Sequence, residues 1–177
     1  ARALKEVEER KRVWRGVLQD LVDHINPIYQ DILSQVDASG VVRLVNMDDV
    51  EEAGLELSVG FRGAPAVVLD AYTQSGGERS ASVIAFLLSL QQRVVSPFRA
   101  IDEFDVHMDP RNREAIFRMI FSHVKRSPDV QYIVITPSQI TILDEDVNLI
   151  FVQNVYGRSE VREVSLVEGK AESGGSS

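Results

Sequence analysis

The sequence predicts an α/β domain in which a short, largely parallel sheet is flanked by helices and preceded by one long helix. Three observations predict it. Apolar residues recur every three or four positions over residues 1–36, which is a helical spacing. After residue 40, short apolar runs of strand length alternate with longer helical patterns. The 177 residues give room for one compact domain of ordinary composition, with 44% hydrophobic and 26% charged residues.

The first predicted element is a helix over residues 1–36. Its apolar stripe consists of Leu4, Val7, Trp14, Leu18, Leu21, Ile25, Ile28, Ile32 and Val36. At about 1.5 Å per residue this helix would be on the order of 50 Å long, which exceeds the width of a small domain. Its first half should therefore project into solvent or pair with another helix as the end of a coiled coil. Packing of residues 1–20 on the chain's own core is the alternative. Pro27 predicts a kink or a break, because it lacks the N–H of the helical ladder.

Residues 37–167 are predicted to form the α/β lobe. In order, its elements are strands at 41–46 and 55–61, a helix at 80–95, a strand at 98–102, a helix at 111–125 and strands at 132–136 and 149–153. Strands alternating with helices imply a sheet covered on both faces. Residues 168–177 are a polar tail that we expect to lie outside the fold.

Composition excludes several classes of function. The net charge of −8 argues against a chain that by itself binds nucleic acid broadly through phosphates. The absence of cysteine excludes disulfides and thiol catalysis. Three scattered histidines, His24, His107 and His123, do not have the spacing of a metal site, and we expect His24 and His123 to be surface or boundary residues. No apolar run is long enough to span a bilayer, so the protein is expected to be soluble, with no membrane partner.

The first motif with chemical meaning is Ser75-Gly76-Gly77-Glu78, which opens into the apolar helix predicted at 80–95. Two glycines let backbone amides approach an anion closely, and a helix N-terminus adds a partial positive charge at the same place. The segment therefore suits a phosphate. Ordinary turns and helix caps use the same residue types, so this motif alone does not decide between the two.

The second motif is the acid pair Asp102-Glu103 at the end of a predicted buried strand. An acid in this position can hold Mg²⁺, and a neighbouring carboxylate can orient the water that attacks a phosphoryl group. Acid pairs also occur after strands as solvated loop entries. The combination is more specific than either motif, because a glycine-rich turn, one helix and a strand ending in Asp-Glu follow one another in the order found in ABC-type ATPases.

With these motifs in place, the chain resembles the structural maintenance of chromosomes (SMC) family. The stretches SGGERS, SPFRAIDEFDVHMDPRNR and YIVITPSQ carry the resemblance, over roughly residues 55–155, and are most similar to the sixth eukaryotic member and its archaeal-type relatives. The resemblance implies the C-terminal lobe of an ABC-type P-loop ATPase head, preceded by a coiled-coil stub.

The resemblance also implies roles for individual residues. Ser75, Gly76, Gly77 and Glu78 match the signature motif, which meets ATP held by the opposite head. Asp102 matches the Walker B acid that binds Mg²⁺, and Glu103 matches the catalytic glutamate. Asp109 matches the D-loop aspartate, which signals across the dimer interface. Gln139 stands near the position of a switch histidine, and a plain exit from the strand is the alternative. Gln74 replaces the leucine that most relatives carry.

The phosphate-binding pattern G-x-x-x-x-G-K-[ST] is missing from the sequence. In the SMC family that loop lies in a separate N-terminal lobe, so the chain is expected to be a fragment of a longer protein. The cofactors implied are ATP and Mg²⁺. The partners implied are the N-terminal Walker A lobe, a second SMC head, a kleisin-type subunit and DNA through the assembled complex. The location implied is the chromosome, in the nucleus or the nucleoid. A DNA double-strand-break repair ATPase and a kleisin-binding module that does not hydrolyse ATP are the alternatives.

Overall fold

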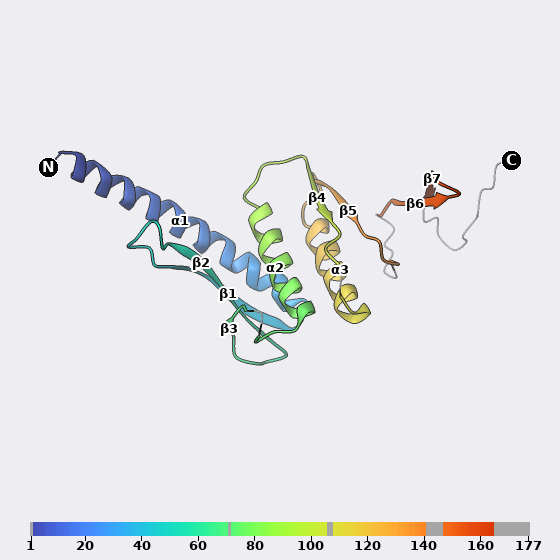
Figure 1. Ribbon diagram of the computed structural model, residues 1–177, viewed down its shortest axis with the longest axis horizontal. Helices are drawn as coiled ribbons and strands as arrows, with labels where there is room; N and C mark the ends of the chain where they lie inside the picture. Colours follow the sequence, from blue (N-terminus) through green and yellow to red (C-terminus); the bar gives the residue numbers. More distant parts are fainter. Residues whose placement is uncertain (1, 71, 106–107, 141–146, 165–177) are drawn as a thin grey trace. The chain divides into compact units, whose positions relative to one another are not determined.

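The computed structural model describes residues 2–70, 72–105, 108–140 and 147–164. The chain divides into two compact units, Ala1–Gln139 and Ile140–Ser177. In the first unit the elements follow in the order α1, β1, β2, β3, α2, β4, α3 and β5, and the second unit holds β6 and β7 (Figure 1). The residues of the predicted tail from 168 to 177 lie outside the described part.

Helix α1 (Arg2–Ser34) runs without interruption through Pro27, so the predicted break at this proline is wrong. All of its buried residues lie in its second half, and Ile25 and Tyr29 on either side of Pro27 are fully buried. Packing on both sides of the proline therefore holds the helix together despite one missing hydrogen bond. Leu4, Val7, Val13 and Val17 in the first half are exposed, as expected for a helix that extends away from its core.

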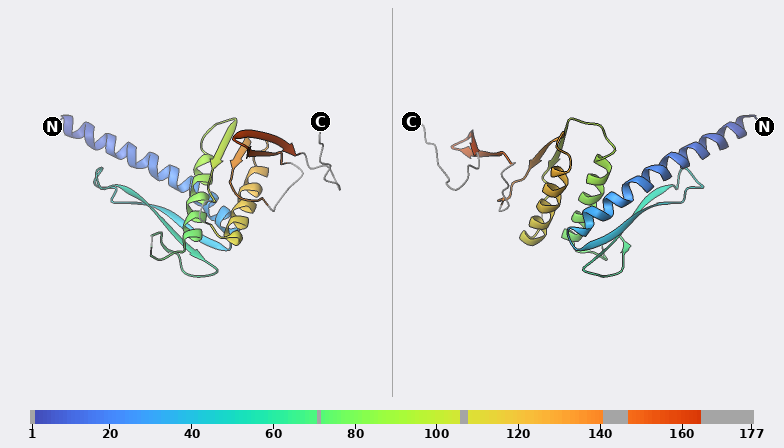
Figure 2. Two further views of the ribbon diagram at one scale, coloured as in Figure 1. Left: turned by 45° about the vertical axis from the view of Figure 1, so that its right-hand side comes forward. Right: turned by 180° about the vertical axis from the view of Figure 1, so that it is seen from behind.

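Strands β1 (Ala38–Val45), β2 (Gly54–Phe61) and β3 (Val67–Val68) form an antiparallel sheet in that order. Both views in Figure 2 show this sheet lying along α1. Asn26 of α1 fastens it, because its side-chain amide donates to the Val42 carbonyl at 2.9 Å and accepts the Val42 N–H at 2.8 Å. One helix side chain thus satisfies both peptide groups of a residue on the edge strand.

The α/β layer consists of α2 (Gly76–Gln91), β4 (Phe98–Asp102), α3 (Pro110–Lys125) and β5 (Gln131–Ile135). Strands β4 and β5 pair in parallel, as predicted, with Asp102 opposite Ile135. Because α3 is the crossover between them, the start of α3 lies at the end of the layer where β4 finishes (Figure 1).

Side chains alternate along both parallel strands between half-buried and exposed. The expectation that the strands are covered on both faces is therefore wrong for the described part of the chain, because helices cover one face and Phe98, Ile133 and Ile135 are exposed on the other. The core of the first unit lies between α1, the first sheet, α2 and α3. Its fully buried large side chains include Tyr29, Ile32, Leu33, Leu88, Ile116, Met119 and Ile120.

The second unit is a hairpin of β6 (Leu149–Val155) and β7 (Arg158–Val164). The strand predicted at 149–153 is found within β6, but the expectation that it is covered on both faces is wrong, because β6 is exposed over nearly its whole length and pairs antiparallel with β7. The turn has positive φ at both Tyr156 (51°) and Gly157 (80°), as a two-residue hairpin loop requires. The Asn154 side chain closes it by accepting the Gly157 N–H at 2.9 Å.

Candidate functional site

The predicted signature segment forms the first turn of α2 rather than a loop in front of it. Ser75 is the N-cap: its Oγ accepts the Glu78 N–H at 3.2 Å, and the Glu78 carboxylate accepts the Ser75 N–H at 3.2 Å. This reciprocal arrangement is a capping box. Helix α2 therefore begins at Gly76, earlier than the predicted start at residue 80. The sequence signal was present, since a Ser followed three residues later by Glu before an apolar run marks a helix start.

The capping box leaves this turn able to receive an anion. Within the described residues, the N–H groups of Gly76 and Gly77 have no protein partner, and both lie where the helix dipole places about half a positive charge. The Ser75 hydroxyl accepts one hydrogen bond from the cap and keeps its own hydrogen available for donation. Ser75 and Gly76 are exposed. The turn thus offers two amides and one hydroxyl to a phosphate-like group.

The residues before the signature are fixed by a polar turn. The Asp70 carboxylate accepts the N–H groups of Tyr72 at 2.5 Å and Thr73 at 2.9 Å, and these bonds lower its pKa. Gln74 accepts the Asp70 N–H at 3.1 Å and the Thr73 hydroxyl at 2.7 Å. Glutamine at a position where most relatives carry leucine therefore has a structural role, because its side-chain oxygen accepts two hydrogen bonds within the turn that precedes the signature.

The acid pair lies at the carboxyl end of β4, where both Asp102 and Glu103 are exposed. The Glu103 N–H donates to the Ile135 carbonyl at 2.9 Å, which ties the start of the loop to the end of β5. Glu103 has φ 45°, in the left-handed region that a residue with a Cβ occupies at a cost of about 1 kcal/mol or more. Strain of this kind is concentrated at functional sites, and here it falls on the predicted catalytic glutamate.

Asp109 of the predicted D-loop is the N-cap of α3. Its Oδ1 accepts the N–H groups of Arg111 and Asn112, each at 3.1 Å, and its Oδ2 accepts the side-chain amide of Asn112 at 2.6 Å. The hydrogen bond from the Asn112 backbone is the main cause of a lowered Asp109 pKa. The carboxylate therefore stays ionised at neutral pH and is held against the first turn of α3.

The first turns of α2 and α3 touch at Gly77. A Cβ built on Gly77 would overlap the amide nitrogen of Asn112 and lie 2.9 Å from its Cγ, closer than real Cβ atoms approach. The Asn112 side chain therefore occupies the place of the missing side chain of Gly77. Asn112 brings the predicted signature and the predicted D-loop acid together, and the sequence analysis did not identify it.

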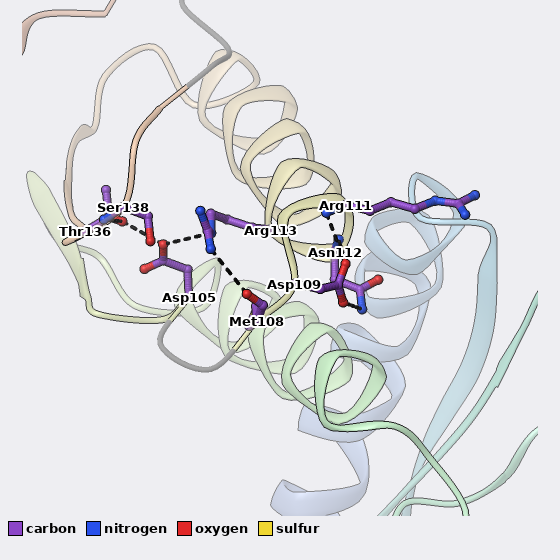
Figure 3. A network of polar contacts seen from close by, with 8 residues as sticks. All are labelled: Asp105, Met108, Asp109, Arg111, Asn112, Arg113, Thr136 and Ser138. Atoms are coloured by element: carbon purple, nitrogen blue, oxygen red, sulfur yellow. Dashed lines mark hydrogen bonds and ion pairs between the residues drawn. The ribbon is translucent and has the colours of Figure 1, made fainter.

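A second group that the sequence analysis did not identify is centred on Asp105, in the loop that follows the acid pair (Figure 3). The Asp105 side chain is fully buried, accepts the Thr136 hydroxyl at 2.7 Å and lies 3.4 Å from Nε of Arg113. Thr136 in turn accepts the Ser138 N–H at 3.0 Å, and Arg113 donates to the Met108 carbonyl at 3.2 Å. This network connects the loop after β4, the start of α3 and the segment after β5.

Gln139 and the three histidines complete the residues singled out in the sequence. Gln139 is exposed, and among the described residues no hydrogen bond involves it, so its role as a switch stays a prediction. His123 is buried, contacts Gln92 through Nε2 and packs edge-on against Tyr132 at 6.4 Å, so the expectation of a surface or boundary residue is wrong. His24 is exposed, as expected, and His107 lies outside the described residues.

The residues present fit the implied cofactors in their chemistry. Two exposed carboxylates at a strand end are oxygen ligands of the kind Mg²⁺ uses, and Mg²⁺ commonly completes its shell with water and substrate phosphate. Among the described residues, no group of three or more His, Cys, Asp or Glu is placed to hold a metal ion. None of the helices in the described ranges has the length and apolar character needed to cross a membrane.

Comparison with known proteins matched residues 30–159 to the family model described as "RecF/RecN/SMC N terminal domain". Structural maintenance of chromosomes protein 5 of Schizosaccharomyces pombe is 35% identical over 145 residues, which cover 81% of this chain and 14% of that protein. Structural maintenance of chromosomes protein 6 of Homo sapiens is 33% identical over 138 residues, covering 77% of this chain and 12% of that protein. The similarity therefore extends to the fifth member as well as the sixth, and the chain spans about one seventh of these relatives.

Solved structures of SMC heads share the fold. An Smc head domain with a coiled coil and joint from Pyrococcus yayanosii has a TM-score of 0.71 and 25% identity over 92% of this chain and 31% of that one. A structure from work on ATP-driven dimerisation and DNA-stimulated activation of SMC ATPases has a TM-score of 0.68 and 26% identity over 85% of this chain and 89% of that one. An Smc head bound to the C-winged helix domain of ScpA has a TM-score of 0.68 and 27% identity, over 86% of this chain and 46% of that one.

Proposed function

Because the chain belongs to the RecF/RecN/SMC family, we propose that it is the C-terminal lobe of an SMC ATPase head, which contributes the signature motif and the Walker B acids to ATP-dependent head dimerisation and hydrolysis. The observation that carries the proposal is the arrangement of α2 and α3. Gly77 of the signature turn lies against Asn112, which belongs to the first turn of the helix that follows the acid pair. The order of long helix, signature and acid pair, without a phosphate loop, supports assignment to the C-terminal lobe.

ATP with Mg²⁺ supplies the phosphoryl group and the counter-charge for the reaction. We assign Asp102 to the metal and Glu103 to the attacking water. Ser75 and the amides of Gly76 and Gly77 bind the terminal phosphate of the nucleotide held by the opposite head. Catalysis of this kind depends on positioning and on charge neutralisation, and two heads would supply these together.

An exposed apolar face of the β4–β5 sheet supports the proposal that a second lobe packs against this one. On the open side of β4 and β5, Phe98 is 57% exposed, Ile133 43% and Ile135 51%. Parallel strands are usually covered on both faces, since exposed apolar side chains of this size are unfavourable in water. We propose that the N-terminal Walker A lobe of the same protein covers this face and completes the head.

The exposed apolar residues in the first half of α1 support the assignment of residues 1–36 to the end of a coiled-coil arm. A second SMC head, a kleisin-type subunit and DNA bound by the assembled complex are the further partners that we propose. The related Smc head bound to a ScpA domain supports the kleisin assignment. This function places the protein on chromosomes, in chromosome organisation or DNA repair.

The test is to co-express the chain with the Walker A lobe of its own protein and to measure ATP turnover. Glu103→Gln keeps the shape of the side chain and should lower turnover by about 10²- to 10⁴-fold, the usual contribution of a general base. The same variant should accumulate ATP-bound dimers, visible as a larger species in size-exclusion chromatography. Glu51→Gln, on an exposed turn between β1 and β2, is the matched control and should turn over like the wild type. Undiminished turnover in Glu103→Gln would refute the assignment of Glu103, and failure of the paired wild-type lobes to hydrolyse ATP would refute the function.

A further inference from the structure

We propose that Asn112 is a positioning residue that holds the signature glycine Gly77 against the D-loop acid Asp109, so that the first turns of α2 and α3 move as one unit. The inference rests on the proposed function for its consequence in ATP binding. The contact itself is a feature of the fold and can be tested without nucleotide.

The orientation of the Asn112 side chain is chemically determined. Its amide nitrogen lies 2.6 Å from Oδ2 of Asp109, and a carboxylate only accepts hydrogen bonds, so the NH₂ group must face it. The backbone N–H of the same asparagine donates to the other oxygen of Asp109 at 3.1 Å. Two hydrogen bonds to one ionised group, one from the backbone and one from the side-chain amide, therefore fix the orientation of the Asn112 side chain.

The backbone of Gly77 lies against that same amide. The close approach leaves no space for a Cβ, and the Asn112 Cβ itself would be only 3.2 Å from one. Any residue other than glycine at position 77 would therefore displace Asn112 from Asp109. In contrast, nothing lies within 4 Å of a Cβ built on Gly76, so the tight fit belongs to the second glycine alone of the pair.

The D-loop is also held on its other side. Arg113, the residue after Asn112, donates to the Met108 carbonyl at 3.2 Å and lies beside the buried Asp105. Arg113 thus contacts Asp105 and Met108 of this loop, and Asn112 connects the same loop to α2. Loss of the Asn112 amide should free the signature turn from the D-loop while leaving the helices and their core intact.

The nucleotide-free test is hydrogen exchange on the whole chain. In Asn112→Ala the two bonded amides of the first turn of α2, those of Glu78 and Arg79, should exchange about tenfold faster, as expected from the loss of the one charge-assisted hydrogen bond that holds Asn112 against this turn. Asn112→Asp keeps the size of the side chain but places a second carboxylate beside Asp109, and it should have the same effect. Arg111→Ala is the matched control, because the Arg111 side chain points away from the network and only its backbone N–H bonds Asp109 (Figure 3). Unchanged exchange in both Asn112 variants would overturn the inference, whether or not the head hydrolyses ATP.

The functional test uses the paired lobes and a double substitution. Asn112→Ala should weaken ATP-driven dimerisation about tenfold, and Gly77→Ala should weaken it further, because the new methyl group displaces Asn112. With both substitutions the methyl group meets a much smaller neighbour, so dimerisation should return to the level of Asn112→Ala alone. If the two effects instead multiply, Gly77 and Asn112 act independently and the inference is wrong. Absence of ATP turnover in the wild-type pair would count against the proposed function, and the exchange experiment would still decide the contact.

Discussion

Substitution of Thr136 by valine tests whether the polar network around the buried Asp105 stabilises the fold. The Thr136 hydroxyl donates to the fully buried Asp105 carboxylate at 2.7 Å and accepts the Ser138 N–H at 3.0 Å. A hydrogen bond to a charged group contributes about 1.5–3 kcal/mol and a neutral one about 0.5–1.5 kcal/mol. The added methyl group offsets less than about 0.8 kcal/mol, because the site is only half-buried. We expect Thr136→Val to lower the free energy of unfolding by about 2 kcal/mol.

The assay is urea unfolding followed by far-ultraviolet circular dichroism, which reports the helices. For a chain of this size, a loss of about 2 kcal/mol corresponds to a fall in Tm of about 4–8 °C. Thr73→Val is the matched control, because the Thr73 hydroxyl bonds Gln74 on an exposed loop, and it should change the free energy of unfolding by less than about 0.5 kcal/mol. Equal effects of the two substitutions would show that the hydroxyl at position 136 contributes nothing beyond an ordinary surface hydrogen bond.

Two further predictions concern stability. Burial is the main cause of a lowered pKa of His123, and the nearby charge of Arg99 lowers it further, so the neutral imidazole is favoured in the folded state. Below about pH 6.5 the unfolded chain therefore binds more protons than the folded chain, and the free energy of unfolding should fall as the pH drops. Urea midpoints at pH 7.5 and about pH 5.5 should show this loss, and a dependence that His123→Gln leaves unchanged would contradict the assignment. Asn26→Ala removes both hydrogen bonds to the buried Val42 and should cost about 2–3 kcal/mol; thermal unfolding equal to that of the wild type would refute the role of Asn26 in fastening the sheet.

Local sequence signals predicted the elements of the first unit well. The helix predicted at 111–125 is found at Pro110–Lys125, because Asp109 and Pro110 are strong signals for a helix start. The strands predicted at 41–46 and 55–61 are found at Ala38–Val45 and Gly54–Phe61. The helix at the signature was predicted to start too late, since the low helix propensity of Gly76 and Gly77 outweighed the capping box around them.

Properties that depend on packing between distant segments were not predictable. Whether Pro27 breaks a helix depends on what Ile25 and Tyr29 pack against, and no local pattern contains that information. The burial of His123 likewise depends on its contact with Tyr132 of β5, and the apolar run of β6 did not indicate that its partner would be β7. The hairpin itself did have a local signal, since Gly157, a residue type typical of turns, follows an apolar run and precedes a polar run that contains two valines.

For the candidate site, the sequence identified the residues with chemical groups but not those that position them. Ser75, Asp102, Glu103 and Asp109 were found because their types and spacing carry meaning. Asn112 was not, because an asparagine in the first turn of a helix is common. Its significance depends on a glycine from another helix lying against it.

The two signature glycines therefore have different reasons to be glycine, and Gly76 gives the cleaner test of phosphate binding. A Cβ on Gly76 meets nothing within 4 Å, so Gly76→Ala fits the fold and, by the higher helix propensity of alanine, should leave stability unchanged or raise it by up to about 1 kcal/mol. In the proposed dimer the same methyl group would lie between the amide of residue 76 and a phosphate of the opposite head. ATP-driven dimerisation should then fall by about tenfold or more while thermal stability does not. If Gly76→Ala dimerises like the wild type, close approach of the signature backbone to nucleotide is not the reason for this glycine, and the signature turn acts in the fold as a helix cap alone.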